Sequence, residues 1–110
     1  MKKINQIAIV YSSTKKTDKA LERVTEIIET SKCEILLSSN IKKLNLGSSK
    51  KASKADLILV LGGDGTMIGS IRHLHSLKVP FLGINSGTVG FLTDLSLSKI
   101  DKLKDILSGA

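Results

Sequence analysis

The sequence predicts an α/β fold, in which helices cover both faces of a parallel sheet of about four strands in three layers. Short apolar, β-branched runs alternate with longer amphipathic segments along the 110 residues, as in βαβ units. Two glycine-rich segments each follow an apolar run, which is where ligand-binding loops of such sheets occur. With 41% hydrophobic and 25% charged residues, the composition is that of one folded domain rather than a disordered chain.

The first half of the chain predicts two strands, a helix and a loop. Residues 4–11 (INQIAIVY) and residues 33–37 (CEILL) are apolar and β-branched, and each predicts a strand. Between them, residues 18–30 place apolar side chains at helical spacing with Lys and Glu on the other face, which predicts an amphipathic helix. Residues 38–54 are polar, lysine-rich and poorly periodic, so we expect a loop with room for one helical turn.

The second half predicts two more strands and two more helices. Residues 55–61 (ADLILVL) are continuously apolar, as expected for a central parallel strand that is buried on both faces. Residues 79–84 (VPFLGI) predict the next strand, and residues 66–77 predict the helix between the two. We expect a last helix over residues 96–107, with Ser96 as its N-cap and Gly109 just past its end.

Composition and charge argue against several classes of protein. The net charge is +7, but it comes from fifteen Lys and two Arg, and the three aromatic residues offer little base stacking, so we expect no nucleic-acid partner. No apolar run approaches the ~18–20 residues that span a bilayer, and no signal peptide precedes the first strand. The single cysteine, Cys33, rules out a disulfide scaffold. We therefore expect a cytoplasmic protein whose positive charge attracts anionic small molecules such as nucleotides.

Residues 62–66 (GGDGT) connect the strongest strand to a helix. Glycines let a ligand approach the backbone, and the N–H groups at a helix start attract anions, so this loop predicts a phosphate-bearing ligand. The carboxylate of Asp64 would repel phosphate unless a hydroxyl or a metal lies between them. Two other interpretations stay open: Asp64 caps the helix, or the loop belongs to a dinucleotide-binding fold, although the acidic residue such a fold needs is absent near Asn85. No P-loop pattern is present.

The two glycine-rich segments together resemble a known family. Residues 62–66 resemble the signature shared by NAD kinases, 6-phosphofructokinases and diacylglycerol-type lipid kinases. Residues 83–94 (GINSGTVGFLTD) resemble the NAD kinase pattern Gly-Ile-Asn-x-Gly-x-Leu-Gly-Phe-Leu-Thr-Asp, with Val89 in place of the leucine. Lipid kinases carry a different segment there. The resemblance extends from the first strand to about Leu95, and it implies a nucleotide-binding N-terminal domain of the NAD kinase type.

The resemblance implies an activity and a site. NAD kinases transfer the γ-phosphate of ATP, or of polyphosphate in some members, to the 2′-hydroxyl of the adenosine ribose of NAD, with Mg²⁺ or another divalent cation on the phosphates. Asp64 would be the catalytic aspartate and would also bind the nucleotide. Gly65 would contact the same nucleotide through its backbone, and Phe91 would line the adenine pocket. Asn85 is a further candidate contact, which either hydrogen-bonds a ribose or bonds only its own turn. The implied phosphate loop consists of Gly62, Gly63, Gly65 and Thr66. No protein ligands for the metal are visible, and family members are commonly homo-oligomers.

One part of the family pattern is absent. Residues 1–110 match a single N-terminal α/β domain, whereas the C-terminal β domain, with its Asn-Glu/Asp motif, is not in this sequence. The resemblance therefore implies little or no activity for this chain alone. Three alternatives stay open: a truncated nucleotide-binding module without activity, a lipid kinase of the same superfamily, and a Rossmann-type redox domain. We expect the lysines of residues 42–54 to form a solvated face, with an electrostatic funnel for ATP as the lesser alternative.

Overall fold

A computed structural model gives the fold of the chain and describes residues 3–85, 95–96 and 99–109. Five strands form one sheet in the order β2-β1-β3-β4-β5, and every neighbouring pair is parallel. The expected α/β class is confirmed, but the sheet has a fifth strand beyond the four expected. The elements in chain order are β1 (Gln6–Tyr11), α1 (Lys15–Thr30), β2 (Glu34–Asn40), the 3₁₀ helix η1 (Ile41–Lys43), α2 (Leu46–Ala52), β3 (Leu57–Gly62), α3 (Asp64–Leu74), the 3₁₀ helix η2 (His75–Leu77), β4 (Phe81–Asn85), β5 (Leu95–Ser96) and α4 (Lys102–Ser108).

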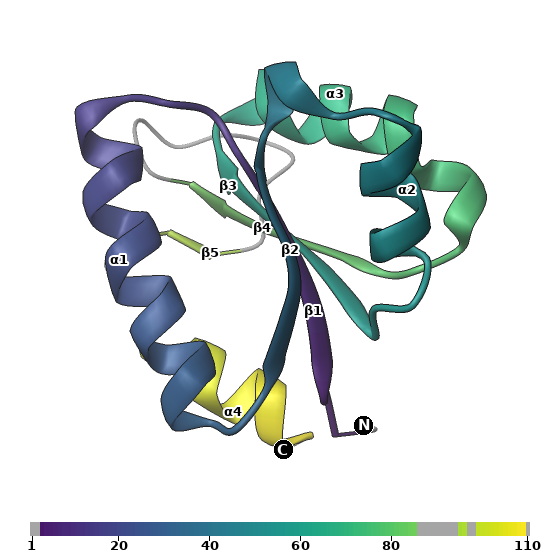
Figure 1. Cartoon of the computed structure of the whole chain (residues 1–110). Coiled ribbons are helices and arrows are strands. Elements are labelled where there is room, and N and C mark those ends of the chain that lie inside the picture. The colour runs from purple at the N-terminus through teal and green to yellow at the C-terminus, as the bar shows by residue number, and fades with distance from the viewer. Residues whose placement is uncertain (1–2, 86–94, 97–98, 110) are drawn as a thin grey trace.

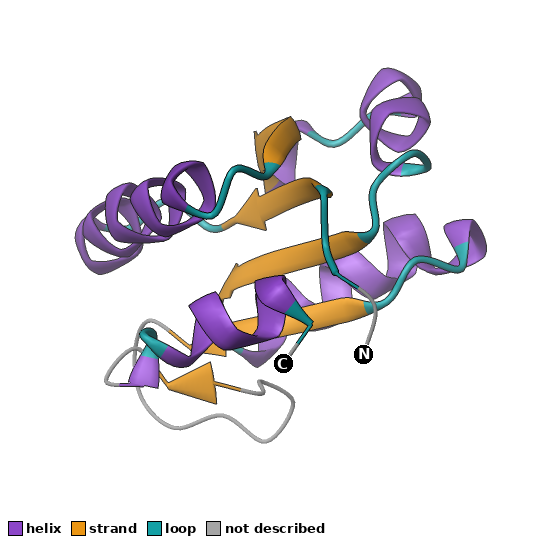
Figure 2. Cartoon of the chain, turned by 90° about the horizontal axis from the view of Figure 1, so that it is seen from below, coloured by secondary structure: helices purple, strands orange, loops and turns teal. Residues whose placement is uncertain are grey.

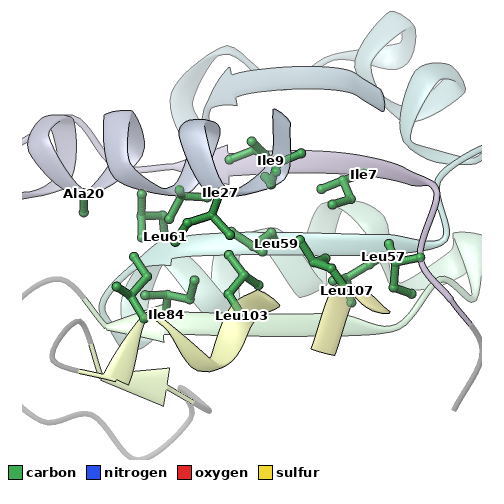
Figure 3. Close-up of a cluster of buried hydrophobic side chains, with 14 residues drawn as sticks. Ile7, Ile9, Ala20, Ile27, Leu57, Leu59, Leu61, Ile84, Leu103 and Leu107 are labelled. Carbon is green, nitrogen blue, oxygen red and sulfur yellow. The ribbon is translucent and has the colours of Figure 1, made fainter. Parts of the chain in front are cut away.

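Helices cover both faces of the sheet, so the domain has three layers (Figures 1 and 2). The buried side chains form one apolar cluster on each face, because successive residues of a strand point to opposite sides. In β3, Leu57, Leu59 and Leu61 face α1 and α4, as Figure 3 shows, whereas Ile58 and Val60 face α2 and α3. Every residue of β3 is buried, which confirms the central parallel strand predicted from the apolar run.

The helix expected over residues 18–30 begins earlier, at Lys15. The hydroxyl of Thr14 accepts a hydrogen bond from the Thr17 amide at 3.1 Å, so Thr14 is the N-cap. The first turn exposes Lys15 and Lys16, and this polar start concealed the helix in the sequence pattern.

The prediction of a loop with room for one helical turn over residues 38–54 is wrong. Instead, β2 continues to Asn40, and η1 and the seven-residue α2 follow it. Polar side chains start both helices: Asn40 accepts from the Lys42 amide at 2.9 Å, and Asn45 forms a capping box with Ser48. Because the residues that start these helices are polar, the segment has no apolar periodicity. Hydrophobic spacing therefore does not predict the two helices.

The last helix also differs from the expectation. α4 begins at Lys102, and Ser96 lies in β5 rather than at an N-cap. Gly109 does end the helix, in the left-handed conformation at φ 83°. The backbone of α4 meets the start of the chain, since the Ile4 amide donates to the Leu107 carbonyl oxygen at 3.0 Å. Among the helices that the structure describes, none is both long and apolar enough to cross a membrane.

Candidate functional site

The candidate site lies at the carboxyl ends of the central strands. β3 and β4 are neighbouring parallel strands, and their last residues, Gly62 and Asn85, are partners in the register. The end of β1 reaches the same edge, because the Ser12 amide donates to the Leu61 carbonyl oxygen at 3.2 Å. Ligands of open α/β sheets bind at this edge. The β3–α3 turn and Asn85 therefore lie at the same edge of the sheet, and residues 86–94 of the second glycine-rich segment lie outside the described residues.

Gly62 is required by the fold itself. Its φ of +154° lies in the region that favours glycine, and a Cβ at this position would lie 2.6 Å from the Thr66 hydroxyl and 2.8 Å from the Ser12 hydroxyl. No side chain larger than hydrogen fits without moving one of these groups. Gly62 thus lets the ends of β1 and β3 and the first turn of α3 approach each other closely.

Gly63 and Gly65 differ from Gly62 in what surrounds them. A Cβ at either position would meet no atom of the described residues within 4 Å, and neither residue has a positive φ. Packing within the described residues therefore does not explain why these two positions are glycine. The space outside the backbone at Gly63 and Gly65 is room in which a ligand can approach the main chain.

Asp64 is the first residue of α3 and is half-buried. The N-cap of this helix is Gly63, without a capping side chain, so the interpretation of Asp64 as the cap is wrong. A carboxylate in the first turn is favoured by the partial positive charge of the helix N-terminus. Asp64 follows two residues after the point where β3 meets Asn85 of β4, so the helix start and the strand ends position this carboxylate at the edge of the sheet.

Thr66 belongs to the same turn and is itself half-buried. Its backbone carbonyl oxygen accepts a hydrogen bond from the buried Ser70 hydroxyl at 2.7 Å, one turn further along α3. Its side-chain hydroxyl lies against Gly62. The side chain of Thr66 therefore packs against the end of β3, in addition to the phosphate contact that the resemblance implies.

Asn85 is buried, with 5% of its surface exposed, at the end of β4. A buried amide is paired with other polar groups, and Asn85 makes polar interactions in this structure. Phe91 and Asp94 lie outside the described residues, so the expected adenine contact at Phe91 stays a prediction.

Sequence reasoning missed the polar residues that follow β1. Ser12 lies against Gly62, and Ser13 accepts a hydrogen bond from the Asn40 side-chain amide at 2.6 Å, which joins the ends of β1 and β2. The only signal in the sequence was a run of hydroxyl residues directly after an apolar strand. The order of the strands, which brings this run beside β3, could not be read from that signal.

The described residues contain no group of three or more His, Cys, Asp or Glu side chains that could hold a metal ion. Cys33, the one cysteine, is half-buried just before β2, and its thiol donates to the Ile4 carbonyl oxygen at 3.1 Å. Burial raises the pKa of this thiol, so little of it is thiolate near neutral pH.

Comparisons with known proteins agree on one family. The model of the ATP-NAD kinase N-terminal domain matches residues 5–109. The chain is 45% identical over 85 residues to the NAD kinase of Colwellia psychrerythraea, covering 76% of this chain and 28% of that protein. It is 36% identical over 111 residues to the NAD kinase of Citrifermentans bemidjiense, covering 91% of this chain and 37% of that protein. The chain therefore spans well under half the length of these relatives.

Among solved structures, a flavodoxin from the domain Archaea is similar in fold. Its TM-score is 0.54 at 16% sequence identity, and the match covers 94% of this chain and 75% of that chain. At this identity the likeness concerns only the doubly wound arrangement of strands and helices.

Proposed function

The chain belongs to the NAD kinase family as an ATP-NAD kinase N-terminal domain, and from this premise we propose that it forms half of an active site that phosphorylates NAD. The reaction moves the γ-phosphoryl group of ATP to the 2′-hydroxyl of the adenosine ribose of NAD, and it yields ADP, NADP and a proton. The observation that supports this proposal is the turn of residues 62–66, which combines an open glycine backbone with a half-buried carboxylate.

Asp64 is the proposed catalytic residue. Phosphoryl transfer depends mainly on positioning and on stabilising charge, and an aspartate can orient the attacking hydroxyl and accept its proton late in the transfer. The helix start and the β3–α3 turn fix the position of this carboxylate. The phosphoryl group then bonds to the 2′-oxygen, the bond to the β-phosphate oxygen of ATP breaks, and the hydroxyl proton passes to Asp64.

The proposed nucleotide contacts are the backbone at Gly65, the amide of Asn85 and, in the segment outside the described residues, the ring of Phe91. Gly62, Gly63 and Thr66 complete the proposed phosphate loop. Gly63 and Gly65 leave their backbone open on the outside, which suits a ligand that takes hydrogen bonds from main-chain amides. Gly62 and Thr66 hold the turn in shape for the other residues.

ATP is the proposed phosphate donor, with Mg²⁺ or another divalent cation carried on its phosphates. We propose that the ATP phosphates bind this cation. The same family membership suggests a cytoplasmic, homo-oligomeric full-length enzyme.

A second domain is proposed to supply the rest of the site. The chain spans 28% and 37% of the two relatives described above. In the family a C-terminal β domain grips the adenosine through its Asn-Glu/Asp motif. We therefore expect this chain alone to bind nucleotide weakly and to turn over little.

A chimera tests the proposal. Residues 5–109 replace the matching segment of the Citrifermentans bemidjiense NAD kinase, and the product is assayed with ATP and Mg²⁺ against NAD and against diacylglycerol. We expect NADP to form and diacylglycerol to remain unchanged. Phosphorylation of the lipid would favour the lipid kinase alternative. A folded chimera that binds NAD without forming NADP would favour a binding module without activity.

A further inference from the structure

A pocket lies away from the glycine turn, between β2 and the end of α2. It has a volume of about 450 Å³ and is lined by Leu36, Lys50, Lys51, Ser53 and Lys54. β2 is the outermost strand of the sheet, and α2 packs against β2 on the face that it shares with α3 (Figure 1). The pocket therefore opens at the β2 edge of the sheet.

The apolar side of the pocket is Leu36, and a bulge in β2 accounts for its position. The register between β1 and β2 pairs Ile7 with Ile35 and Ala8 with Leu37, so Leu36 is the extra residue. As a result Leu36 and Leu37 both pack against the cluster on the α2 side, whereas regular alternation would place only one of them there. The bulge thus adds an apolar surface beneath the last turn of α2.

The polar side of the pocket consists of lysines. Lys50, Lys51 and Lys54 are exposed, and within residues 3–85, 95–96 and 99–109 no carboxylate forms a salt bridge with any of them. Glu34, on the same strand as Leu36, does not line the pocket. Three unpaired ammonium groups at one opening create a positive potential that attracts anions.

At the C-terminal end of α2, the lysine ammonium groups are the polar groups best placed to bind a ligand. The carbonyl oxygens of the last turn are already used: the Ser53 hydroxyl donates to the Lys50 carbonyl oxygen at 2.6 Å, and the Lys54 amide donates to that of Lys51 at 3.3 Å. These bonds partly satisfy the last carbonyl oxygens of α2. The pocket combines one apolar surface with a cationic rim, which suits an anion that carries an apolar group.

From this arrangement we propose that the β2–α2 pocket is a binding site for small organic phosphates, with the apolar group on Leu36 and the phosphate among Lys50, Lys51 and Lys54. This site is separate from the turn at residues 62–66, because its lysines line the end of α2 and Leu36 lies within β2, whereas the turn lies at the carboxyl ends of β3 and β4. It does not depend on the proposed function.

Titration of the 110-residue chain with phenyl phosphate, followed by amide NMR shifts, tests the site. We expect saturable shifts at Leu36 and residues 50–54, weaker shifts with inorganic phosphate or with phenol, and a loss of affinity as the salt concentration rises. Equal shifts with phenol would show an apolar crevice without an anion site and would overturn the proposal. Shifts that rise linearly and spread over every lysine-bearing surface would overturn it as well.

Two triple variants provide the matched comparison. The first variant replaces the three pocket lysines (Lys50→Gln, Lys51→Gln and Lys54→Gln) and so removes the pocket's charge. It should weaken the binding of phenyl phosphate about tenfold, since each ammonium group contributes part of the attraction. The second variant removes the same charge at and just before α4 (Lys99→Gln, Lys102→Gln and Lys104→Gln). It should change the affinity for phenyl phosphate less than about twofold. An equal loss in both variants would show only net-charge attraction. Should the first variant fail to fold, the phenol and inorganic phosphate arms on the unmodified chain still decide the question.

Discussion

The turn between β3 and α3, residues 62–66, and the segment from η1 to the end of α2, residues 41–52, are held in shape in different ways. The turn is fixed by long-range contact: Gly62 lies against Ser12, which comes fifty residues earlier in the chain. The η1–α2 segment is fixed by local capping through Asn40 and Asn45. Because of this difference, we expect a substitution in the turn to affect the core and the candidate site as well. A substitution in the η1–α2 segment should affect that segment alone.

The largest effect is expected for Asp64→Asn in the chimera. Loss of the proposed proton acceptor should lower kcat/KM for NAD about 10²–10⁴-fold, with little change in the free energy of unfolding. Steady-state NADP formation and urea unfolding measure the two quantities. Asp18→Asn is the control, since Asp18 is also a first-turn carboxylate but lies exposed on α1. Equal losses in the two variants would remove the special role of Asp64.

Gly62→Ala should cost the most stability. Strain at φ +154° and the contacts with the Thr66 and Ser12 hydroxyls should lower the free energy of unfolding by about 2–3 kcal/mol. Urea unfolding of the 110-residue chain measures the change. Gly63→Ala is the control and should cost under about 1 kcal/mol, as a less favoured N-cap in open space. Similar costs for both would contradict the contrast between the two glycines.

Asn45→Ala should act on α2 alone. Removing the capping box should cost about 1 kcal/mol and raise amide hydrogen exchange in residues 46–52. Exchange in β3 should change only by the global loss of stability. An increase of exchange in β3 beyond this global loss would show that the η1–α2 segment is coupled to the core and is not held locally.

Leu46→Ser should have the smallest effect. Leu46 is 84% exposed at the start of α2, so the free energy of unfolding should stay within about 0.5 kcal/mol. Ala52→Ser, in the same helix but at a fully buried position, should cost about 1–3 kcal/mol because it buries a hydroxyl. A large cost at Leu46 would mean that its side chain is covered in solution.

The sequence predicts the strands and the glycine turn well because each leaves a strong local pattern. Continuous apolar runs identify β1 and β3, and a strand that meets consecutive glycines before a helix identifies the turn. The sequence does not reveal β5, because two residues are too few for a period. Ser96 resembles an N-cap by type, but its pairing with Asn85 in the sheet determines its place.

The candidate site can be predicted only in part from the sequence, because only some of its residues carry a local pattern. Asp64 and the glycines carry a family pattern, whereas Ser12 joins them only through the order of the strands. The different surroundings of Gly62 and Gly65 cannot be read from the letters, because both are glycine. That distinction depends on atoms from β1 and α3 that meet only after folding.

Gly62 is required by the fold, whereas Gly65 is proposed to leave room for the nucleotide, and Gly65→Ala tests this contrast most directly. Because Gly65 is helical and its Cβ would meet no atom of the part of the chain that the structure describes, the substitution should leave the fold as stable or about 0.5–1 kcal/mol more stable. In the chimera, kcat/KM for NAD should nevertheless fall at least about tenfold, because the added methyl group occupies the ligand's space. An unchanged kcat/KM in this variant would contradict the nucleotide-binding role proposed for Gly65.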